Sequence, residues 1–368
     1  MKTLNFIKTA AFALLVCSAQ ESFAAFNKGN AKLNPNDINF LKTFLMQKSA
    51  DGKMENYKVL NIKKGALDTP EKWDVCGDEG VDRNFVFVWK KDKQNQYNLI
   101  RIQFNKAEGI EIANLGGDMA LPAPADAMAT INLSGCTGLK NFSLDNISAW
   151  NKRQIYGVTI IESNLKKIDL SEVAKNKGSL IGIGIKKNNQ LNEVKFSPIN
   201  LKDENNFASI SENPNLCAIS GTVNFKQGGF FDIKKNALTF AQIAKLSFNN
   251  PQAATRITVG PQADFILSNY FNTETGNHEV KSGTVIDLSK EVNINWRGEN
   301  RPVQVVWFKK EGKKKTLVEM KEVAPAKYEL SGNAGEEYVL QLSSPNFFEG
   351  LPCKGAFTKI QSRTFIIK

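Results

Sequence analysis

The chain has 368 residues, a length that predicts two or three domains at about 100 to 200 residues per domain. Hydrophobic residues make up 42% of it and charged residues 23%, which indicates a folded protein and excludes a chain disordered throughout. The only histidine is His278, which excludes histidine-rich zinc sites and disfavours hydrolases that need a histidine base.

The N-terminus has the three parts of a signal peptide. Lys2 and Lys8 form a basic region, residues 9–16 are apolar, and the small residues Ser22 and Ala24 stand at the −3 and −1 positions of a cleavage site. We therefore expect cleavage after Ala24 and an exported protein, either secreted or at the cell surface, with the periplasm and the outer-membrane surface as further locations.

A lipid anchor at Cys17 is the alternative, because Leu14-Leu15-Val16-Cys17 has the form of a lipobox. Val16 is a poor residue directly before such a cut, so this alternative is the weaker one. No later apolar stretch approaches the ~20 residues that cross a bilayer, so we expect no transmembrane segment. An exported chain is also not expected to bind nucleic acid.

The formal net charge is +11, and an excess of lysine attracts acidic glycans, anionic lipid or cell-wall polymer. The lysines are scattered in pairs, which fits a solvated surface equally well. After the signal peptide the cysteines are widely spaced and form no CxxC motif, so we expect mostly buried free thiols at Cys76, Cys136, Cys217 and Cys353.

The residues next to the predicted leader contain a helical pattern. Apolar side chains at Ile38, Leu41, Phe44 and Leu45 follow Asn36 or Asp37, either of which can cap a helix. With Trp73 and the apolar strand 85–89, this helix is expected to cover the N-terminal end of the middle region of the chain.

The middle of the chain repeats an apolar pattern. Each unit has a short strand with two inward apolar residues, a polar corner and a second apolar segment, which begins at Leu139, Leu165 and Leu191, at intervals of 26 residues. The pattern continues less regularly to about residue 240, and an irregular copy starts at Ile102. One unit cannot bury its apolar side alone, so the units are expected to stack into a continuous core with a parallel strand ladder.

Two features fix the expected register of the stack. Asn188, Asn213 and Asn236 stand three residues after an inward strand residue, where an amide can bond to the main chain of the neighbouring unit. The inward strand residues are expected to be Leu133, Ile160, Ile185, Ile210 and Ile233.

The pattern L-x-L-x-x-N/C-x-x-L is matched by residues 133–139 and 185–191. This stretch resembles the repeats of bacterial secreted and surface leucine-rich-repeat proteins, of the internalin type or the gut-commensal adhesin type, over about residues 100–225. The order of helix, Trp73 and strand is similar to the N-terminal cap of those proteins. A plain β-solenoid or an α/β domain with chance periodicity is the alternative.

The last hundred residues change to short alternating strands, which fit a β-sandwich of about seven strands. Trp307 and Tyr338 stand where immunoglobulin domains place a central Trp and a Tyr two residues before the second Cys, and Leu340 replaces that Cys. The segment resembles immunoglobulin-like modules of bacterial surface proteins. Its expected strands lie at 292–296, 303–308, 328–330, 338–342 and 364–367.

The predicted fold class is therefore mainly β: a leucine-rich-repeat solenoid with an N-terminal helical cap, followed by an immunoglobulin-like β-sandwich that folds on its own. The expected divisions are a signal peptide at 1–24, a cap region at 25–98, the solenoid at 99–255 and the sandwich at 262–368.

No sequence motif of a hydrolase, a nucleotide-binding enzyme or a metal site occurs, so we expect neither an enzyme nor a cofactor. An acidic cluster near Trp73 has oxygen ligands suited to calcium but lacks the spacing of a calcium loop, and a solvated loop is the better interpretation. That cluster consists of Asp74, Asp78, Glu79 and Asp82.

Binding is the remaining class of function. The outward strand residues of a leucine-rich arc form one polar surface on its concave side, suited to an extracellular protein or glycan. The resemblance implies adhesion to a host or neighbouring cell, and the alternative is a glycan-binding accessory protein of the cell envelope. The surface is expected to contain Asn132, Ser134, Thr159, Ile161, Gly184, Lys186, Ser209, Ser211, Asp232 and Lys234.

Overall fold

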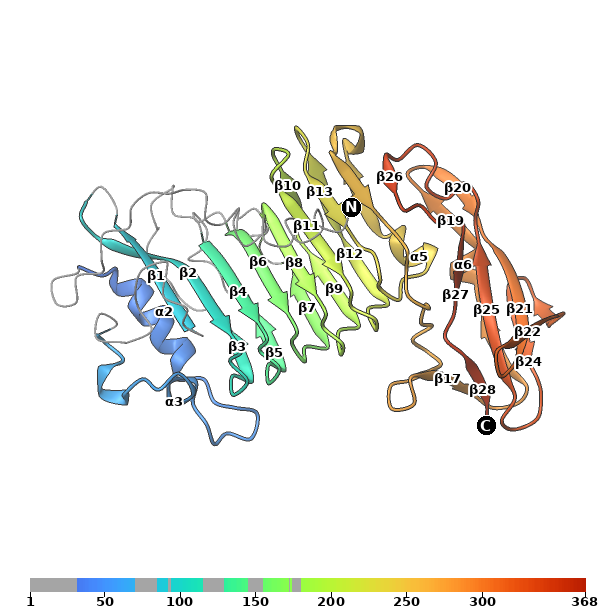
Figure 1. Cartoon of the computed structure of the whole chain (residues 1–368), viewed down its shortest axis with the longest axis horizontal. Helices are drawn as coiled ribbons and strands as arrows, with labels where there is room; N and C mark the ends of the chain where they lie inside the picture. Colours follow the sequence, from blue (N-terminus) through green and yellow to red (C-terminus); the bar gives the residue numbers. More distant parts are fainter. Residues whose placement is uncertain are drawn as a thin grey trace.

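The computed structural model of the chain consists of a helical N-terminal part, a stack of parallel strands and a mainly β C-terminal part, in that order along the long axis (Figure 1). The signal peptide, Cys76 and the acidic cluster near Trp73 lie outside the residues that the structure describes. Those residues are 32–69, 85–91, 94–114, 129–144, 155–171, 173 and 180–368.

The N-terminal part packs a helix against the first strands. The main helix, α2, spans Pro35–Leu45 and buries Leu41, Phe44 and Leu45, as the sequence pattern predicts. Phe44 stacks on Phe104 with ring centroids 5.4 Å apart, so the helix covers the end of the core. The other elements are α3 (Asn56–Val59), η1 (Lys64–Ala66) and β1 (Phe85–Lys91), which is antiparallel to β2 (Tyr97–Asn105).

The predicted helix cap is wrong. Because α2 begins at Pro35, both Asn36 and Asp37 lie inside its first turn rather than before it. The fixed φ of proline suits this first helical position. The buried Asp37 instead accepts a hydrogen bond from the backbone N–H of Leu99, at 2.8 Å, and so ties the helix to β2.

The centre of the molecule is a β-solenoid of stacked parallel strands, as expected from the repeats. Its main sheet has nine strands in the order β1-β2-β4-β6-β8-β11-β13-β15-β26. All neighbours from β2 onward run parallel. The bounds are β4 (Ala129–Ser134), β6 (Ile155–Ile161), β8 (Gly182–Lys186), β11 (Phe207–Ser211), β13 (Phe230–Asp232), β15 (Arg256–Thr258) and β26 (Cys353–Lys354).

A second layer of strands lies on the other side of the coils. It consists of the pair β3–β5 and a five-stranded sheet in the order β10-β12-β9-β7, with β14 paired to β12. The bounds are β3 (Ile112–Asn114), β5 (Asn141–Ser143), β7 (Lys167–Leu170), β9 (Glu193–Phe196), β10 (Ile199–Leu201), β12 (Ala218–Phe225) and β14 (Leu246–Asn249), and a short helix, α5 (Phe240–Ile243), precedes β14.

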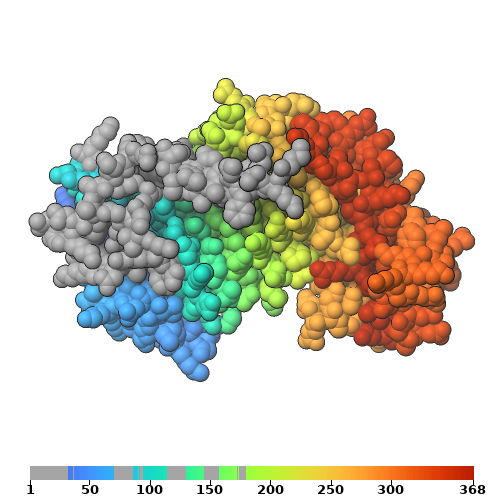
Figure 2. All heavy atoms as spheres, in the orientation of Figure 1, coloured from blue at the N-terminus to red at the C-terminus, as the bar shows by residue number. Residues whose placement is uncertain are grey.

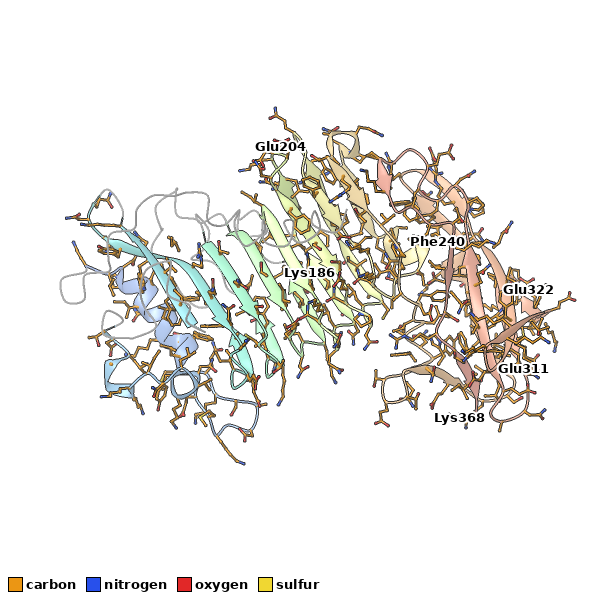
Figure 3. The ribbon with its side chains drawn as sticks, in the orientation of Figure 1. Lys186, Glu204, Phe240, Glu311, Glu322 and Lys368 are labelled. Atoms are coloured by element: carbon orange, nitrogen blue, oxygen red, sulfur yellow. The ribbon has the colours of Figure 1, made fainter. Side chains whose placement is uncertain are left out.

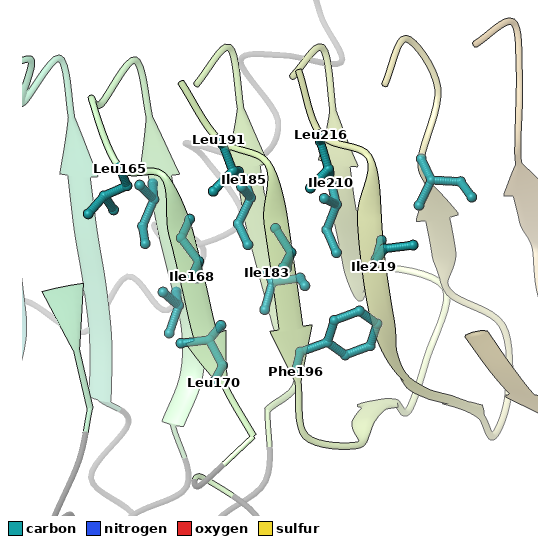
Figure 4. Packing of buried hydrophobic residues seen from close by; sticks show 14 of the residues in the cluster. Leu165, Ile168, Leu170, Ile183, Ile185, Leu191, Phe196, Ile210, Leu216 and Ile219 are labelled. Carbon is teal, nitrogen blue, oxygen red and sulfur yellow. The ribbon is translucent and has the colours of Figure 1, made fainter. Parts of the chain in front are cut away.

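The core lies between the two layers (Figure 4). Leu133, Ile160, Ile185 and Ile210 are direct neighbours across the main sheet, and each is at most 1% exposed. Ile233 is fully buried as well, so the predicted inward register is confirmed. Equivalent apolar side chains of neighbouring coils therefore stack on one another, and this stacking fixes the register of the whole sheet.

Each coil turns out of the main sheet at one corner, where a residue adopts a left-handed backbone conformation. The φ angles there lie between 55° and 65°, and all but one of these residues carry a side chain. Such a conformation is unfavourable by about 1 kcal/mol for residues other than glycine, so something must hold the corner. The residues are Lys106, Gly135, Glu162, Lys187, Glu212 and Lys235.

The residue after each left-handed corner forms a ladder of buried side chains. Asn188 donates to the carbonyl of Ile160 in the preceding coil, at 3.1 Å, and its backbone N–H donates to the Asn213 Oδ1 of the next coil, at 3.0 Å. Asn213 repeats both bonds in the next coil, with Ile185 and Asn236, and Asn236 makes the corresponding bonds with Ile210 and Gln262. The expected bonding of these amides to neighbouring main chain is thus confirmed, and we call them the asparagine ladder.

The C-terminal part has two main sheets, which contain four of the five expected strands, while the expected strand at 292–296 pairs in a separate hairpin. Seven strands form a sheet in the order β16-β17-β28-β25-β21-β22, with β27 paired to β25, and three form the sheet β18-β24-β23. The bounds are β16 (Phe271–Asn272), β17 (Asn277–Val280), β18 (Thr284–Asp287), β21 (Gln304–Glu311), β22 (Lys314–Val318), β23 (Lys321–Ala324), β24 (Lys327–Leu330), β25 (Glu337–Ser343), β27 (Lys359–Gln361) and β28 (Phe365–Ile367).

Trp307 and Tyr338 lie in the core of this part, and Trp307 pairs directly with Leu340. The Trp307 ring meets that of Phe365 edge-on at 5.3 Å between centroids. A short helix and a hairpin complete the part: α6 (Ser289–Val292), β19 (Asn293–Trp296) and β20 (Glu299–Pro302).

The C-terminal part shares a core with the end of the solenoid. Phe240 of α5 packs on Phe347, with ring centroids 4.7 Å apart, and Phe248 of β14 meets Trp296 at 6.3 Å. The solenoid sheet also continues beyond residue 255 through β15 and then takes β26 from the C-terminal part as its last strand. These contacts join the two parts, and the independent folding of the last hundred residues stays a prediction.

We expect Asn188→Ala to lower the free energy of unfolding by about 3 kcal/mol. It leaves the buried carbonyl of Ile160 and the backbone N–H of Ser163 without their partners, and each orphaned buried group costs about 1 to 3 kcal/mol. The matched control is Asn189→Ala at the exposed next position, where we expect a change within about 0.5 kcal/mol. Urea unfolding measures both, and equal midpoints would contradict the ladder.

We also expect the fragment 262–368 to be less stable than the intact chain by at least about 3 kcal/mol. Without Phe240 and Phe248 it exposes part of the rings of Phe347 and Trp296, and burying one such side chain is worth about 1.5 to 3 kcal/mol. Guanidinium unfolding followed by tryptophan fluorescence compares the two. The same midpoint for fragment and intact chain would show that the C-terminal part is an independent domain.

Candidate binding face

The ten residues expected at the binding surface lie on one face of the main sheet. Five of them are successive neighbours across the strands and form a middle row: Asn132, Thr159, Gly184, Ser209 and Asp232. Four more are successive neighbours in the same way and form a second row: Ser134, Ile161, Lys186 and Ser211. The tenth residue, Lys234, lies just beyond the end of β13. The structure therefore brings the predicted set together, and we call this surface the strand face.

The predicted outward positions are not all exposed to solvent. Ser209 and Ser211 are 0% and 1% exposed, and Asp232 is 8% exposed. The two serine hydroxyls bond to each other at 2.8 Å, and Asp232 accepts from the backbone N–H of Lys234 at 3.1 Å. Most of the middle row is thus a floor of small or internally bonded side chains, over which longer neighbours lie.

Lys186 is the longest of these neighbours, and it crosses the floor. On the neighbouring strand its backbone pairs with Ser211, which lies two residues after Ser209. Its ammonium, however, lies 5.2 Å from the ring centroid of Phe207, which lies two residues before Ser209. The side chain must therefore pass over the level of Gly184 and Ser209 to reach that ring. Figure 3 marks Lys186 in the middle of the solenoid.

A third row on the same face was missed by the sequence analysis. Phe207, Phe230 and Arg256 are neighbours across β11, β13 and β15, and the guanidinium of Arg256 lies 5.2 Å from the ring centroid of Phe230. Both phenylalanines are partly exposed. The alternation of inward and outward residues along a strand does predict this row, because each Phe stands two residues before a predicted outward residue. The short strand expected for each repeat unit did not extend far enough to include it.

The strand face is positively charged among the described residues. Asp232 pairs with Lys234 at 3.1 Å, which neutralises both. By contrast, no described carboxylate lies within 4 Å of the cationic group of Lys186, Arg256 or Lys354, the last of which pairs with Thr258 on β15. Burial lowers the pKa of Lys186, because removing water from around the ammonium disfavours its charged form.

A shallow groove lies apart from the strand face, along the left-handed corners. It is lined by Glu162, Lys187, Asn189, Glu212, Pro214, Lys235, Gln262 and Ala263. Its charges are paired within the groove, Lys187 with Glu162 at 3.4 Å and Lys235 with Glu212 at 3.6 Å. Arg363 of the C-terminal part donates to the carbonyl of Pro214 at 2.7 Å, and the outline of the molecule is notched between the two parts (Figure 2).

The remaining reactive groups are held in unreactive forms. Cys136 is buried and free, and Cys217 and Cys353 are partly buried and free. Burial raises the pKa of Cys136 to about 11 and that of Cys353 to about 12, so both are protonated at neutral pH. Within the described ranges, His, Cys, Asp and Glu side chains form no group of three suited to a metal ion.

His278 is fully buried in the C-terminal part. Its Nε2 accepts from the backbone N–H of Leu267 at 2.9 Å, and its ring stacks on Phe365 with centroids 4.2 Å apart. Its Nδ1 lies 3.2 Å from the carbonyl of Arg363, so the neutral ring carries its proton there. Burial lowers the pKa of His278 to about 4.

Comparisons of the chain with models of known families, with curated proteins and with solved structures found no match. In the part of the chain that the structure describes, no helix is long and apolar enough to cross a membrane.

We expect the free energy of unfolding to fall as the pH drops from about 6.5 to about 4, by up to about 3 kcal/mol from His278 alone. The unfolded chain takes up this proton near pH 6.5, whereas the folded chain resists it until its lowered pKa, so acid favours unfolding in that window. Urea titrations at pH 7 and pH 5 measure the difference.

The control is His278→Gln, which keeps one acceptor and one donor but does not titrate. Asp264 and Glu291, whose pKa burial raises, act with the opposite sign, and they act equally in both proteins. A pH dependence that is the same with and without the imidazole would contradict the assignment to His278.

Proposed function

We propose that this chain is an exported bacterial protein, secreted or at the cell surface, that adheres by binding a protein of a host or neighbouring cell through the strand face. In this proposal the solenoid is a leucine-rich-repeat arc, and the C-terminal part is an immunoglobulin-like module that serves as a spacer or second contact. The repeat pattern of the sequence and the signal-peptide pattern support it.

The observation that carries the proposal is the pair of phenylalanines, each with a cation over its ring, on a strand face that is otherwise small and polar. Phe207 and Phe230 stand at outward strand positions, where a solvated sheet has no need of aromatic rings. Aromatic residues and arginine are enriched in the central anchors of protein interfaces. A surface that combines them over a flat floor is therefore suited to a protein partner.

A glycan-binding accessory protein of the cell envelope is the second candidate. The same rings lie near two polar side chains, Asp232 of the middle row and its cross-strand neighbour Thr258, and an aromatic ring beside polar groups also suits a sugar. Under this alternative the strand face would still be the contact surface. Substitutions on the strand face should therefore weaken binding of a protein and of a glycan alike.

The test is a panel of extracellular host proteins and a glycan array, each probed with the mature chain and with Phe230→Ser. Loss of an interface anchor costs about 2 kcal/mol or more, so we expect binding of a partner to weaken at least about thirtyfold. The matched control is Phe308→Ser, which removes a partly exposed ring from β21 of the C-terminal part. Thermal unfolding checks that both variants are folded.

A protein ligand lost with Phe230→Ser and kept with Phe308→Ser supports the proposal. A ligand lost only with Phe308→Ser would move the contact to the C-terminal part and overturn the strand face as the binding surface. Binding confined to the glycan array would favour the second candidate.

A further inference from the structure

Lys186 differs from the other unpaired lysines of the solenoid in its burial. A lysine that has no ion pair is normally exposed, because a buried ammonium loses its hydration without compensation. The unpaired lysines on other surfaces of the solenoid follow this rule and are exposed: Lys106, Lys166, Lys202, Lys226 and Lys245. Lys186 is half-buried, and it makes no hydrogen bond or ion pair with any described residue.

The carboxylates near Lys186 are already engaged. Asp232 and Glu212 are close enough to favour its charged form, but Asp232 pairs with Lys234 and Glu212 with Lys235. The ring of Phe207 is therefore its closest compensation, and a cation–π contact replaces only part of the lost hydration. A carboxylate brought by a ligand would supply the missing partner.

The side chain of Lys186 extends past the level of Gly184 and the buried Ser209 to the ring of Phe207. Because the core fixes the register of these strands, the ammonium has a defined position beside that ring before a ligand arrives. Binding through a positioned side chain avoids the loss of rotamer freedom that a mobile surface lysine suffers. Lys186 thus has the features of an anchor for an anion rather than of a solvated surface charge.

Two more cations without an ion pair to a described residue lie on the same face, Arg256 on β15 and Lys354 on β26. With Lys186 they extend the positive charge from β8 to the end of the sheet, with the neutral pair of Asp232 and Lys234 between them. The second half of the strand face therefore attracts negative charge over several strands.

Resting on the proposed function, we infer that the partner is a protein with an acidic surface, and that one of its Asp or Glu carboxylates binds the ammonium of Lys186 next to the ring of Phe207. Electrostatic complementarity of this kind speeds association and selects among partners.

The breadth of the strand face favours a protein over an acidic glycan. The parallel strands from β2 to β15, about 4.8 Å apart, span about 30 Å, which is the scale of a protein contact. Two grooves lined by described residues lie elsewhere, one along the corners and one in the C-terminal part, whereas the floor at Gly184 and Ser209 consists of backbone and small side chains.

The experiment measures binding of poly-L-glutamate of about 20 residues and of polygalacturonate of similar charge to the mature chain, at low and high salt. Lys186→Met removes the charge but keeps an apolar side chain over Gly184 and Phe207. The matched control is Lys195→Met on the opposite layer, which removes the same charge from the exposed side of β9.

We expect poly-L-glutamate to bind more weakly as salt rises. Because Lys186→Met removes a charge-assisted contact, we expect it to weaken binding about tenfold. We expect Lys195→Met to weaken binding less than about twofold. Equal losses with the two variants would mean that only net charge matters and would overturn the inference. Tighter binding of polygalacturonate, with the same dependence on Lys186, would replace the acidic protein by an acidic glycan.

The inference can fail while the proposed function stands. Suppose that a protein partner from the panel no longer binds Phe230→Ser, but binds Lys186→Met and the unaltered chain with equal affinity at every salt concentration. This result would confirm the strand face and refute the acidic contact. A partner lost with neither variant would refute both.

Discussion

The structure depends on a buried line of hydrogen bonds along the corners of the solenoid. At each corner one residue adopts a left-handed conformation, and at the later corners the next residue is an asparagine whose side chain bonds to the preceding coil, as Asn188 does to Ile160. The side-chain amides of Asn188, Asn213 and Asn236 each bond to main-chain groups of the preceding coil, so no coil satisfies its polar groups alone. This interdependence converts separate repeats into one stack.

The same stacking creates the strand face. Once the corners fix each coil against the next, equivalent positions align in rows across the sheet, and the outward rows differ in character. Small residues at Gly184 and Ser209 leave room for Lys186 to lie across them, and the aromatic row holds its charged end. A half-buried cation on an otherwise flat sheet is thus a consequence of the register, and the proposed contact with an acidic partner depends on it.

A stack of this kind needs both ends covered, and this protein covers them differently. At the N-terminal end α2 lays Phe44 on Phe104 and is tied to β2 through Asp37. At the other end the C-terminal part supplies a strand, β26, and the rings of Trp296 and Phe347. The second cover is a shared core, in which side chains from both sides of residue 260 pack against each other.

The sequence by itself determined the stack, because its signals are local and periodic: the inward register from Ile160 to Ile233 and the bonding of the asparagines both result from spacing. It also placed the predicted binding residues on one face, since the alternation of residues along a strand determines which face of the sheet each side chain occupies. Burial of Ser209, the position of Lys186 over Phe207 and the joined core around Phe240 were decided only by the tertiary structure. They arise between coils or between parts, where side-chain length and packing, rather than spacing, determine which groups meet.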